Sequence, residues 1–210
     1  YLADRGRIYG DVRLFDDQGT GIHFYTNRED TIADQEMTVE LSRIDLKQFK
    51  KVLPYLPDVE GWLGGSLHYV DSEGQMMLSA DMNLDNFVYE KSPLGNWTMS
   101  GAYLPGDNNA HHVDGFITYN DQEIIYMNGV YQADETGQEN ITGELELQHF
   151  PLRVINPFIP EKMVAFTGDI DGTLSMTGSP MKPVLNGGLQ LDSVLMIMPD
   201  MSVGFRFDNK

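Results

Sequence analysis

The chain has 210 residues, and a hydrophobic content of 41% with 22% charged residues favours a folded protein over a disordered segment. Its 14 Lys and Arg residues stand against 32 Asp and Glu, a formal net charge of −18. This acidity argues against nucleic acid as a partner, because phosphates need cationic side chains, and it disfavours docking on anionic membranes. The chain has no cysteine, which excludes disulfides and thiolate metal sites.

Apolar and polar residues alternate with a period of two through most of the chain, which is typical of strands with one buried face. This pattern predicts strands within residues 8–14, 37–41, 63–69, 78–85, 97–104, 113–119, 123–133, 141–147, 170–176 and 185–192. Helical spacing is confined to residues 46–53 and 152–159, and a proline follows each segment. We therefore expect an all-β fold, an elongated and curled antiparallel sheet with two short helices that plug or cap it.

The most informative feature of the sequence is a repeat at an offset of 107 residues. Leu63-Gly-Gly-Ser-Leu-His-Tyr69 returns as Ile170-Asp-Gly-Thr-Leu-Ser-Met176, and Leu78 to Asp85 returns as Leu185 to Asp192. The two helical segments precede these copies at an offset of 106. Repetition at this scale predicts a sheet that grows by adding similar strand units. We divide the chain into leading strands (1–45), a first repeat unit (46–150) and a truncated second unit (151–210).

One face of the predicted strands is almost wholly apolar in both copies. With the flanking strands, the residues expected on this face are Leu63, Leu67, Tyr69, Leu78, Met82, Leu84, Ile141, Leu145, Leu147, Ile170, Leu174, Met176, Leu185, Leu189, Leu191, Val203, Phe205 and Phe207. Such a face must be covered by a second sheet, by curling of the sheet on itself, or by a ligand. A sandwich with a sealed core and an open trough both fit the pattern. The 12 methionines, which are flexible and polarizable, favour an apolar surface that meets changing partners.

Motifs for catalysis and metal binding give no comparable signal. Asp169-x-Asp171 lacks the other acidic residues of a calcium loop, and the adjacent His111 and His112 should point to opposite faces of a strand. The sequence has no Gly-x-Ser-x-Gly, phosphate-loop or His-Glu-x-x-His motif. Apolar and glycine positions recur between the copies, whereas candidate metal ligands do not. We expect no enzymatic activity, no metal and no cofactor.

The second copy carries a more specific motif, in which Thr177-Gly-Ser-Pro180 and Pro183-Val-Leu-Asn-Gly187 join two apolar strands. This arrangement resembles the C-terminal domain of TamB-like proteins, the inner-membrane-anchored subunits of the translocation and assembly module. The resemblance covers about residues 140–210. It is weaker in residues 40–105, where Asp71-Ser-Glu-Gly74 replaces the Gly-Ser-Pro segment. For residues 1–40 it rests on strand character.

The resemblance implies a taco-shaped sheet whose hydrophobic trough carries phospholipid acyl chains between inner and outer membranes, as in related AsmA-like lipid-transfer proteins. It also implies a location in the periplasm, a full-length protein anchored in the inner membrane, and an outer-membrane barrel partner of the Omp85 type. Tyr1 leads almost directly into a strand pattern, so we expect the chain to be a piece of a longer protein. Its terminal strands would then offer edges through which two copies could pair.

Two other functions remain open on the sequence. The trough or its edge could act as a chaperone that holds unfolded outer-membrane protein strands by β-augmentation. A β-sandwich adhesin or carbohydrate-binding module would instead expose aromatic platforms, for which Trp62, Trp97, Tyr103 and Tyr131 are the candidates.

Overall fold

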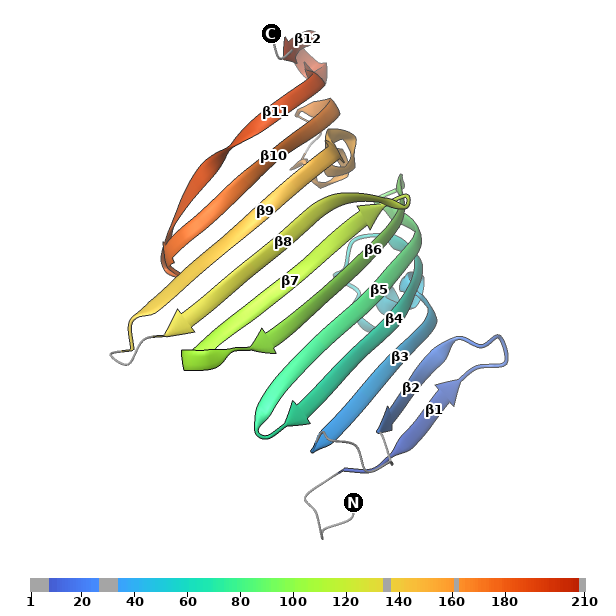
Figure 1. Ribbon diagram of the computed structural model, residues 1–210. Coiled ribbons are helices and arrows are strands. Elements are labelled where there is room, and N and C mark those ends of the chain that lie inside the picture. Colours follow the sequence, from blue (N-terminus) through green and yellow to red (C-terminus); the bar gives the residue numbers. More distant parts are fainter. Residues whose placement is uncertain (1–7, 27–33, 134–136, 161–162, 208–210) are drawn as a thin grey trace.

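A computed structural model describes residues 8–26, 34–133, 137–160 and 163–207, and these form one 12-stranded antiparallel sheet (Figure 1). The strands follow one another in chain order, each pairing with its neighbours in the sequence. Their bounds are β1 (Asp11–Phe15), β2 (Gly21–Thr26), β3 (Gln35–Asp45), β4 (Val59–Ser72), β5 (Gln75–Tyr89), β6 (Ser92–Pro105), β7 (Ala110–Tyr119), β8 (Gln122–Ala133), β9 (Glu139–Pro151), β10 (Ala165–Ser179), β11 (Lys182–Met198) and β12 (Val203–Phe207). The predicted all-β, curled antiparallel sheet is confirmed.

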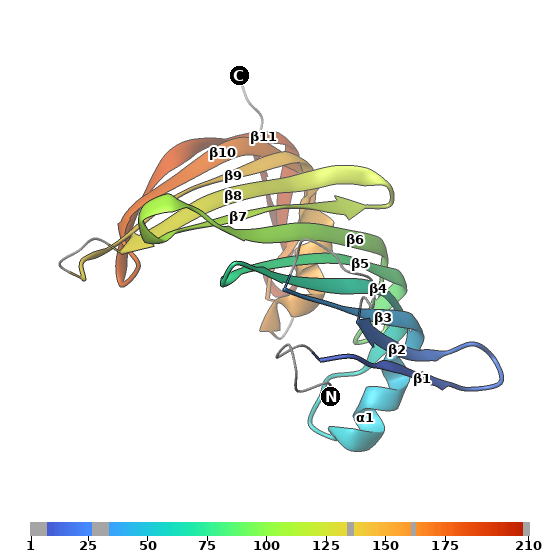
Figure 2. The same cartoon turned by 60° about the horizontal axis from the view of Figure 1, so that its bottom comes forward.

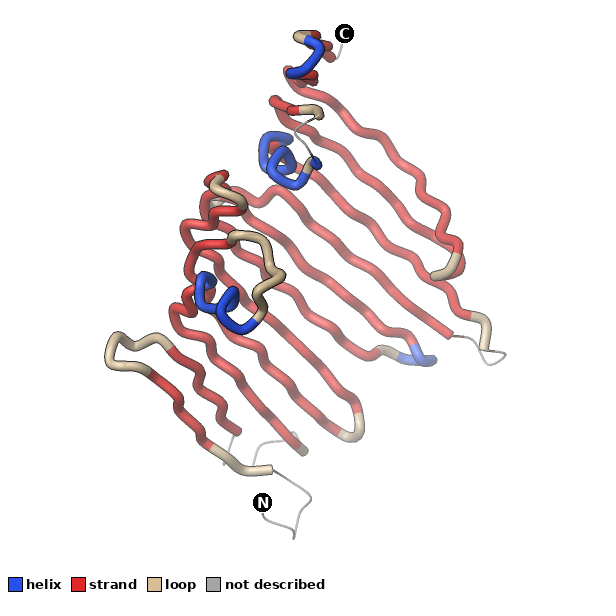
Figure 3. Tube along the Cα trace, turned by 180° about the vertical axis from the view of Figure 1, so that it is seen from behind, coloured by secondary structure: helices blue, strands red, loops and turns tan. Residues whose placement is uncertain are grey.

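The sheet arches as a single layer, and the segment between β9 and β10 lies beneath the arch (Figure 2). The two predicted helices are short and largely of 3-10 type: η2 (Leu46–Gln48) continues into α1 (Phe49–Val52), and η4 (Leu152–Phe158) contains Pro157. Two further 3-10 turns are η3 (Asp107–Asn109) and η6 (Pro199–Met201). Seen from behind, η2, α1, η4 and η6 gather along one end of the strands, while η3 lies at the other (Figure 3).

Cross-strand register keeps apolar residues on one face of the sheet. Because side chains alternate along a strand, residues that oppose one another across strands share a face. One row of opposing residues, from β1 to β11, is Val12, Phe24, Val39, Leu67, Ala80, Gly101, Gly115, Met127, Leu145, Leu174 and Gly187. The adjacent row, on the other face, begins His23, Glu40, Ser66, Asp81 and Ser100. The sheet therefore has an apolar face and a largely polar face.

The apolar face has no second sheet against it in the described part of the chain. Over all the described residues, six apolar side chains are buried, namely Leu94, Ala110, Ile124, Leu152, Val154 and Val194, and no large side chain is less than 2% exposed. A β-sandwich would bury whole rows of side chains between two layers. The sandwich arrangement, one of the two alternatives left by the sequence pattern, is therefore wrong.

The sequence repeat is also a repeat of backbone geometry. Leu63 opposes Leu84 in the first copy, and Ile170 opposes Leu191 in the second, each at the offset of 107 residues. Gly65 and Gly172 occupy equivalent positions with φ of 130° and 151°, and a Cβ atom added there would lie 2.1 and 2.2 Å from a backbone oxygen on the facing strand. Both the backbone conformation and the space require glycine at these two positions.

We predict that Gly65→Ala or Gly172→Ala lowers the free energy of unfolding by about 2 kcal/mol or more, since each adds strain and a backbone clash. Gly101→Ala is the control, because its φ is not in the left-handed region and its added Cβ meets no atom closer than 3.4 Å. Urea denaturation followed by circular dichroism measures the three variants. Equal loss of stability in all three would contradict the assignment.

Candidate functional site

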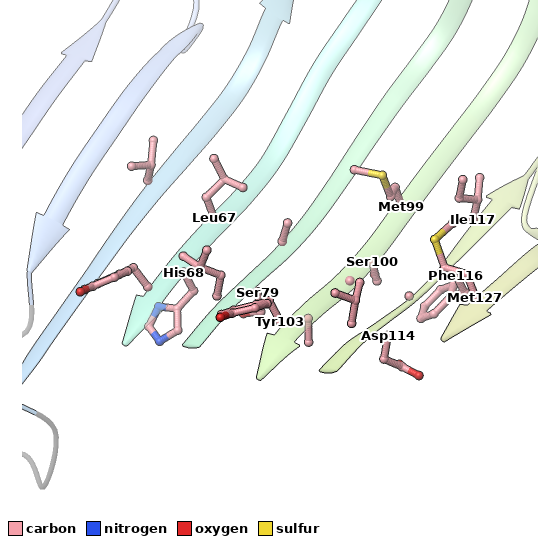
Figure 4. Close-up of a pocket in the computed structure, with 18 of the residues that line it drawn as sticks. Leu67, His68, Ser79, Met99, Ser100, Tyr103, Asp114, Phe116, Ile117 and Met127 are labelled. Atoms are coloured by element: carbon pink, nitrogen blue, oxygen red, sulfur yellow. The ribbon is translucent and has the colours of Figure 1, made fainter. Parts of the chain in front are cut away.

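A groove of about 660 Å³ lies on the apolar face, open to solvent across β2 to β8 (Figure 4). Its apolar lining side chains include Phe24, Met37, Val39, Leu67, Tyr69, Leu78, Met99, Tyr103, Val113, Ile117 and Met127. Several of them remain half exposed, such as Leu67 at 47% and Met99 at 48%. His68 and Asp114 border the groove but engage the polar face, through Thr38 and the Tyr126 hydroxyl. The groove thus offers hydrocarbon contact without charge.

A second apolar cavity, of about 470 Å³, continues from the first and shares Met99 and Ile117 with it. Strands β4 to β7 form one side through residues such as Leu63, Met82, Leu84 and Trp97, and η4 forms the other through Val154, Ile155 and Phe158. We call the two cavities together the apolar groove. One end of the groove is open and the other is roofed by η4.

Two contacts near the C-terminal end of η4 fix its position. The Asn156 side-chain amide donates to the Phe166 carbonyl at 2.8 Å, and the Phe166 N–H donates to the Asn156 side-chain oxygen at 2.8 Å, which ties η4 to β10. The Phe158 ring lies 4.5 Å from the Tyr89 ring of β5, centroid to centroid. A segment that leaves β9 therefore crosses the apolar face to reach β5. By contrast, no side chain described in α1 lines the apolar groove, and Phe49 and Leu53 of the predicted helical stripe are 39% and 52% exposed.

The structure places the predicted trough residues in two groups. Leu67, Tyr69 and Leu78 line the first cavity, and Leu63, Met82 and Leu84 line the second. The remaining twelve lie outside both cavities, in the same cross-strand rows on β9 to β12: Ile141, Leu145, Leu147, Ile170, Leu174, Met176, Leu185, Leu189, Leu191, Val203, Phe205 and Phe207. Several remain open to solvent, with Leu185 65% exposed. The apolar face therefore extends past the groove to the β12 edge.

Sequence reasoning missed most groove residues on β6 to β8 and those of η4. On β6, Met99 and Tyr103 face the groove while Leu104, on the other face, is equally apolar, so alternation alone does not identify the face. Pairing with Met82 and Leu78 on β5 identifies it.

Charged and titratable groups concentrate on the polar face. His23 lies between Asp11 of β1 and Glu40 of β3, with ring nitrogens 3.0 and 3.3 Å from their carboxylate oxygens. The hydrogen bond from His23 holds the pKa of Asp11 below its ordinary value. On the same face, hydrogen bonding to the Asp114 carboxylate raises the pKa of the Tyr126 hydroxyl. These contacts stabilise the strands and leave the apolar groove uncharged.

The four aromatic candidates for a carbohydrate platform are all half-buried. Trp97 lies in the second cavity, where its indole N–H donates to the Leu94 carbonyl at 2.8 Å, and Tyr103 lines the first. The Arg43 guanidinium covers the Trp62 ring at 5.2 Å from its centroid. Tyr131 has a raised pKa because its hydroxyl is hydrogen-bonded to Glu139. By register Trp62 lies on the polar face and the other three lie on the apolar face, where the His111 ring stands between those of Tyr103 and Tyr131, 5.8 and 5.7 Å from their centroids.

The candidate metal ligands are not brought together. Asp171 accepts from the His149 backbone N–H, and His111 stacks on Tyr103 with ring centroids 5.8 Å apart. Within the described ranges, no group of three or more His, Asp or Glu side chains is arranged to hold a metal ion.

Comparison with protein-family models, with curated proteins and with solved structures gave no match. Among the described residues, no helix is long and apolar enough to cross a membrane.

We predict that Asn156→Ala frees η4 from β10 and costs about 1–3 kcal/mol of stability, since the half-buried N–H and carbonyl of Phe166 both lose their partner. Amide hydrogen exchange should show faster exchange at Phe166, and Trp97 emission should shift to longer wavelength as the second cavity opens to water. The exposed Asn140, on β9, gives the control variant Asn140→Ala. Unchanged exchange at Phe166 would show that other contacts hold η4.

Proposed function

We propose that this chain is part of a lipid-transfer protein, in which the apolar groove shelters phospholipid acyl chains from water as they pass between two membranes. The observation that carries the proposal is the open apolar face. It runs across the sheet, has no second layer over the described residues, and leaves large side chains such as Leu67, Met99 and Leu189 about half exposed. Exposed apolar surface of this extent marks a site of interaction.

The energetics favour an acyl chain as the occupant. Each methylene removed from water contributes about 0.8 kcal/mol, so a chain of myristoyl length gains about 10 kcal/mol when fully covered. Hydrocarbon needs no hydrogen bonds, and the groove offers almost none. Met37, Met82, Met99 and Met127 line it with flexible, polarizable side chains that adapt to a chain of variable conformation.

The biological setting in this proposal rests on the resemblance of residues 140–210 to TamB-like proteins. It comprises the periplasm of a double-membraned bacterium, an inner-membrane anchor in the full-length protein, and an Omp85-type barrel as partner. No catalysis is required, because transfer needs only a continuous apolar path.

A second candidate function, binding of unfolded outer-membrane strands, is favoured by the sheet edges. Strands β1 and β12 each pair with a single strand of the described chain, and every residue of both is exposed. Such edges are templates for strand addition, either by a client strand or by a second copy of this chain.

The test of lipid binding is extraction of the purified protein with organic solvent, followed by mass spectrometry, before and after delipidation and incubation with phospholipid vesicles. We expect phospholipid to co-purify and to reload. Protein that carries no lipid in either state would contradict the proposal.

Met99→Arg should reduce the bound lipid at least tenfold, because it places a guanidinium where the two cavities meet, and a charge in hydrocarbon is costly. Leu104→Arg is a matched control: it lies on the same strand, is 46% exposed against 48% for Met99, and faces the other side of the sheet. Circular dichroism should show the same strand content in both variants. Equal lipid loss in both would indicate general destabilisation rather than a blocked groove.

A further inference from the structure

A third cavity, of about 380 Å³, adjoins the η4 end of the apolar groove and differs from it in chemistry. It shares Leu94 and Val154 with the second cavity, and both of these side chains are only 4% exposed. The Trp97 ring of the second cavity lies 4.9 Å from the Tyr119 ring of the third, centroid to centroid. The lining of the third cavity adds the Ser92 hydroxyl and the Arg153 guanidinium. The apolar groove therefore adjoins a cavity of mixed lining, in which a cation and a hydroxyl accompany apolar side chains.

Arg153, like Arg43, lies over an aromatic ring and differs from the cations that form ion pairs. Arg13, Lys47 and Lys50 each pair with an Asp or Glu side chain, as expected where carboxylates outnumber cations. Among the described residues, no carboxylate lies within 4.0 Å of Arg153. Its guanidinium instead lies over the Tyr119 ring, 5.9 Å from the centroid. Contact with a ring face leaves the planar donor fork available for an anion.

We propose that Arg153 binds the phosphate of a phospholipid whose acyl chain lies in the second cavity. The inference rests on the proposed lipid function and adds a headgroup site to it. A guanidinium donates two parallel hydrogen bonds to a phosphate. This paired geometry matches the phosphate oxygens better than the point charge of an ammonium group does. The Ser92 hydroxyl lines the same cavity and can donate a further hydrogen bond. The Asn156 amide also borders the cavity, but its bonds to Phe166 already occupy it.

Neither cavity of the apolar groove is lined by Lys or Arg. Among the described residues, Arg153 is therefore the one cation that lines the three cavities, at the end roofed by η4. Because the chain is acidic overall and disfavours contact with an anionic surface, a local guanidinium is what favours a phosphate at this position.

Trp97 provides a reporter for the test. The chain has two tryptophans, so Trp62→Phe leaves Trp97, within the second cavity, as the source of indole fluorescence. Titrations of this background with dodecyl phosphate, dodecanol and inorganic phosphate separate the contribution of the chain from that of the headgroup. We expect dodecyl phosphate to bind about tenfold more tightly than dodecanol, the factor that one charge-assisted contact supplies, and inorganic phosphate to bind far more weakly than either.

Arg153→Gln should bring the affinity for dodecyl phosphate down to that for dodecanol, without changing the latter. Arg43→Gln is the matched control, because Arg43 also lies over an aromatic ring yet lines none of the three cavities. It should retain the tenfold preference. Thermal unfolding of each variant checks that the fold is intact.

Two results would overturn the headgroup site alone. One is that the protein with Arg153 binds dodecyl phosphate and dodecanol equally tightly. The other is that the Arg153→Gln variant still prefers dodecyl phosphate. Inorganic phosphate that binds as tightly as dodecyl phosphate would reduce the site to one for free anions and also overturn it. Failure of both alkyl probes to bind would overturn the headgroup site and, with it, the proposed function of the groove.

Discussion

A β-strand directs successive side chains to opposite faces. In this sheet the apolar side chains of all strands share one face only because the register between neighbouring strands aligns them. A slip of one residue at any pairing would send the apolar set of one strand to the polar face. The register instead keeps Val12 of β1 in line with Gly187 of β11 through every intervening pair. The apolar face and the groove within it depend on this alignment, because no second layer covers the sheet in the part of the chain that the structure describes.

Irregularities in the strands are placed so that the alignment survives them. Leu41 and Ile44 are three residues apart, yet they oppose Gly65 and Leu63, which are two apart, so one extra residue is absorbed in a bulge at Arg43. The equivalent bulge in the second copy lies at His149, at the offset of 106 residues. Bulges bend a strand and increase its twist. They stand directly before η2 and η4, where the chain must leave the sheet.

Much of this architecture is readable from the sequence because both of its periods are simple. The alternation of apolar and polar residues with a period of two identified the outer strands. The sequence repeat at an offset of 107 residues predicted that Leu63 and Ile170 oppose equivalent residues on their neighbouring strands. The middle strands were harder: Ala102, Leu104 and Phe116 are apolar on the polar face, so β6 and β7 lack clean alternation. The site at η4 was out of reach, since Arg153 and Tyr119 come together only through the arch of the sheet, which local patterns do not encode.

The strictly sequential strand order has a consequence for how the chain folds. Each strand finds its partner in the segment just before it, so no step requires the closure of a long loop between distant segments. Folding can then proceed by elongation, with each completed hairpin serving as the template for the next strand as it becomes available. A nascent or translocating polypeptide can acquire its structure from one end, and the reverse process, fraying from β1 or β12, need not disturb the strands at the centre.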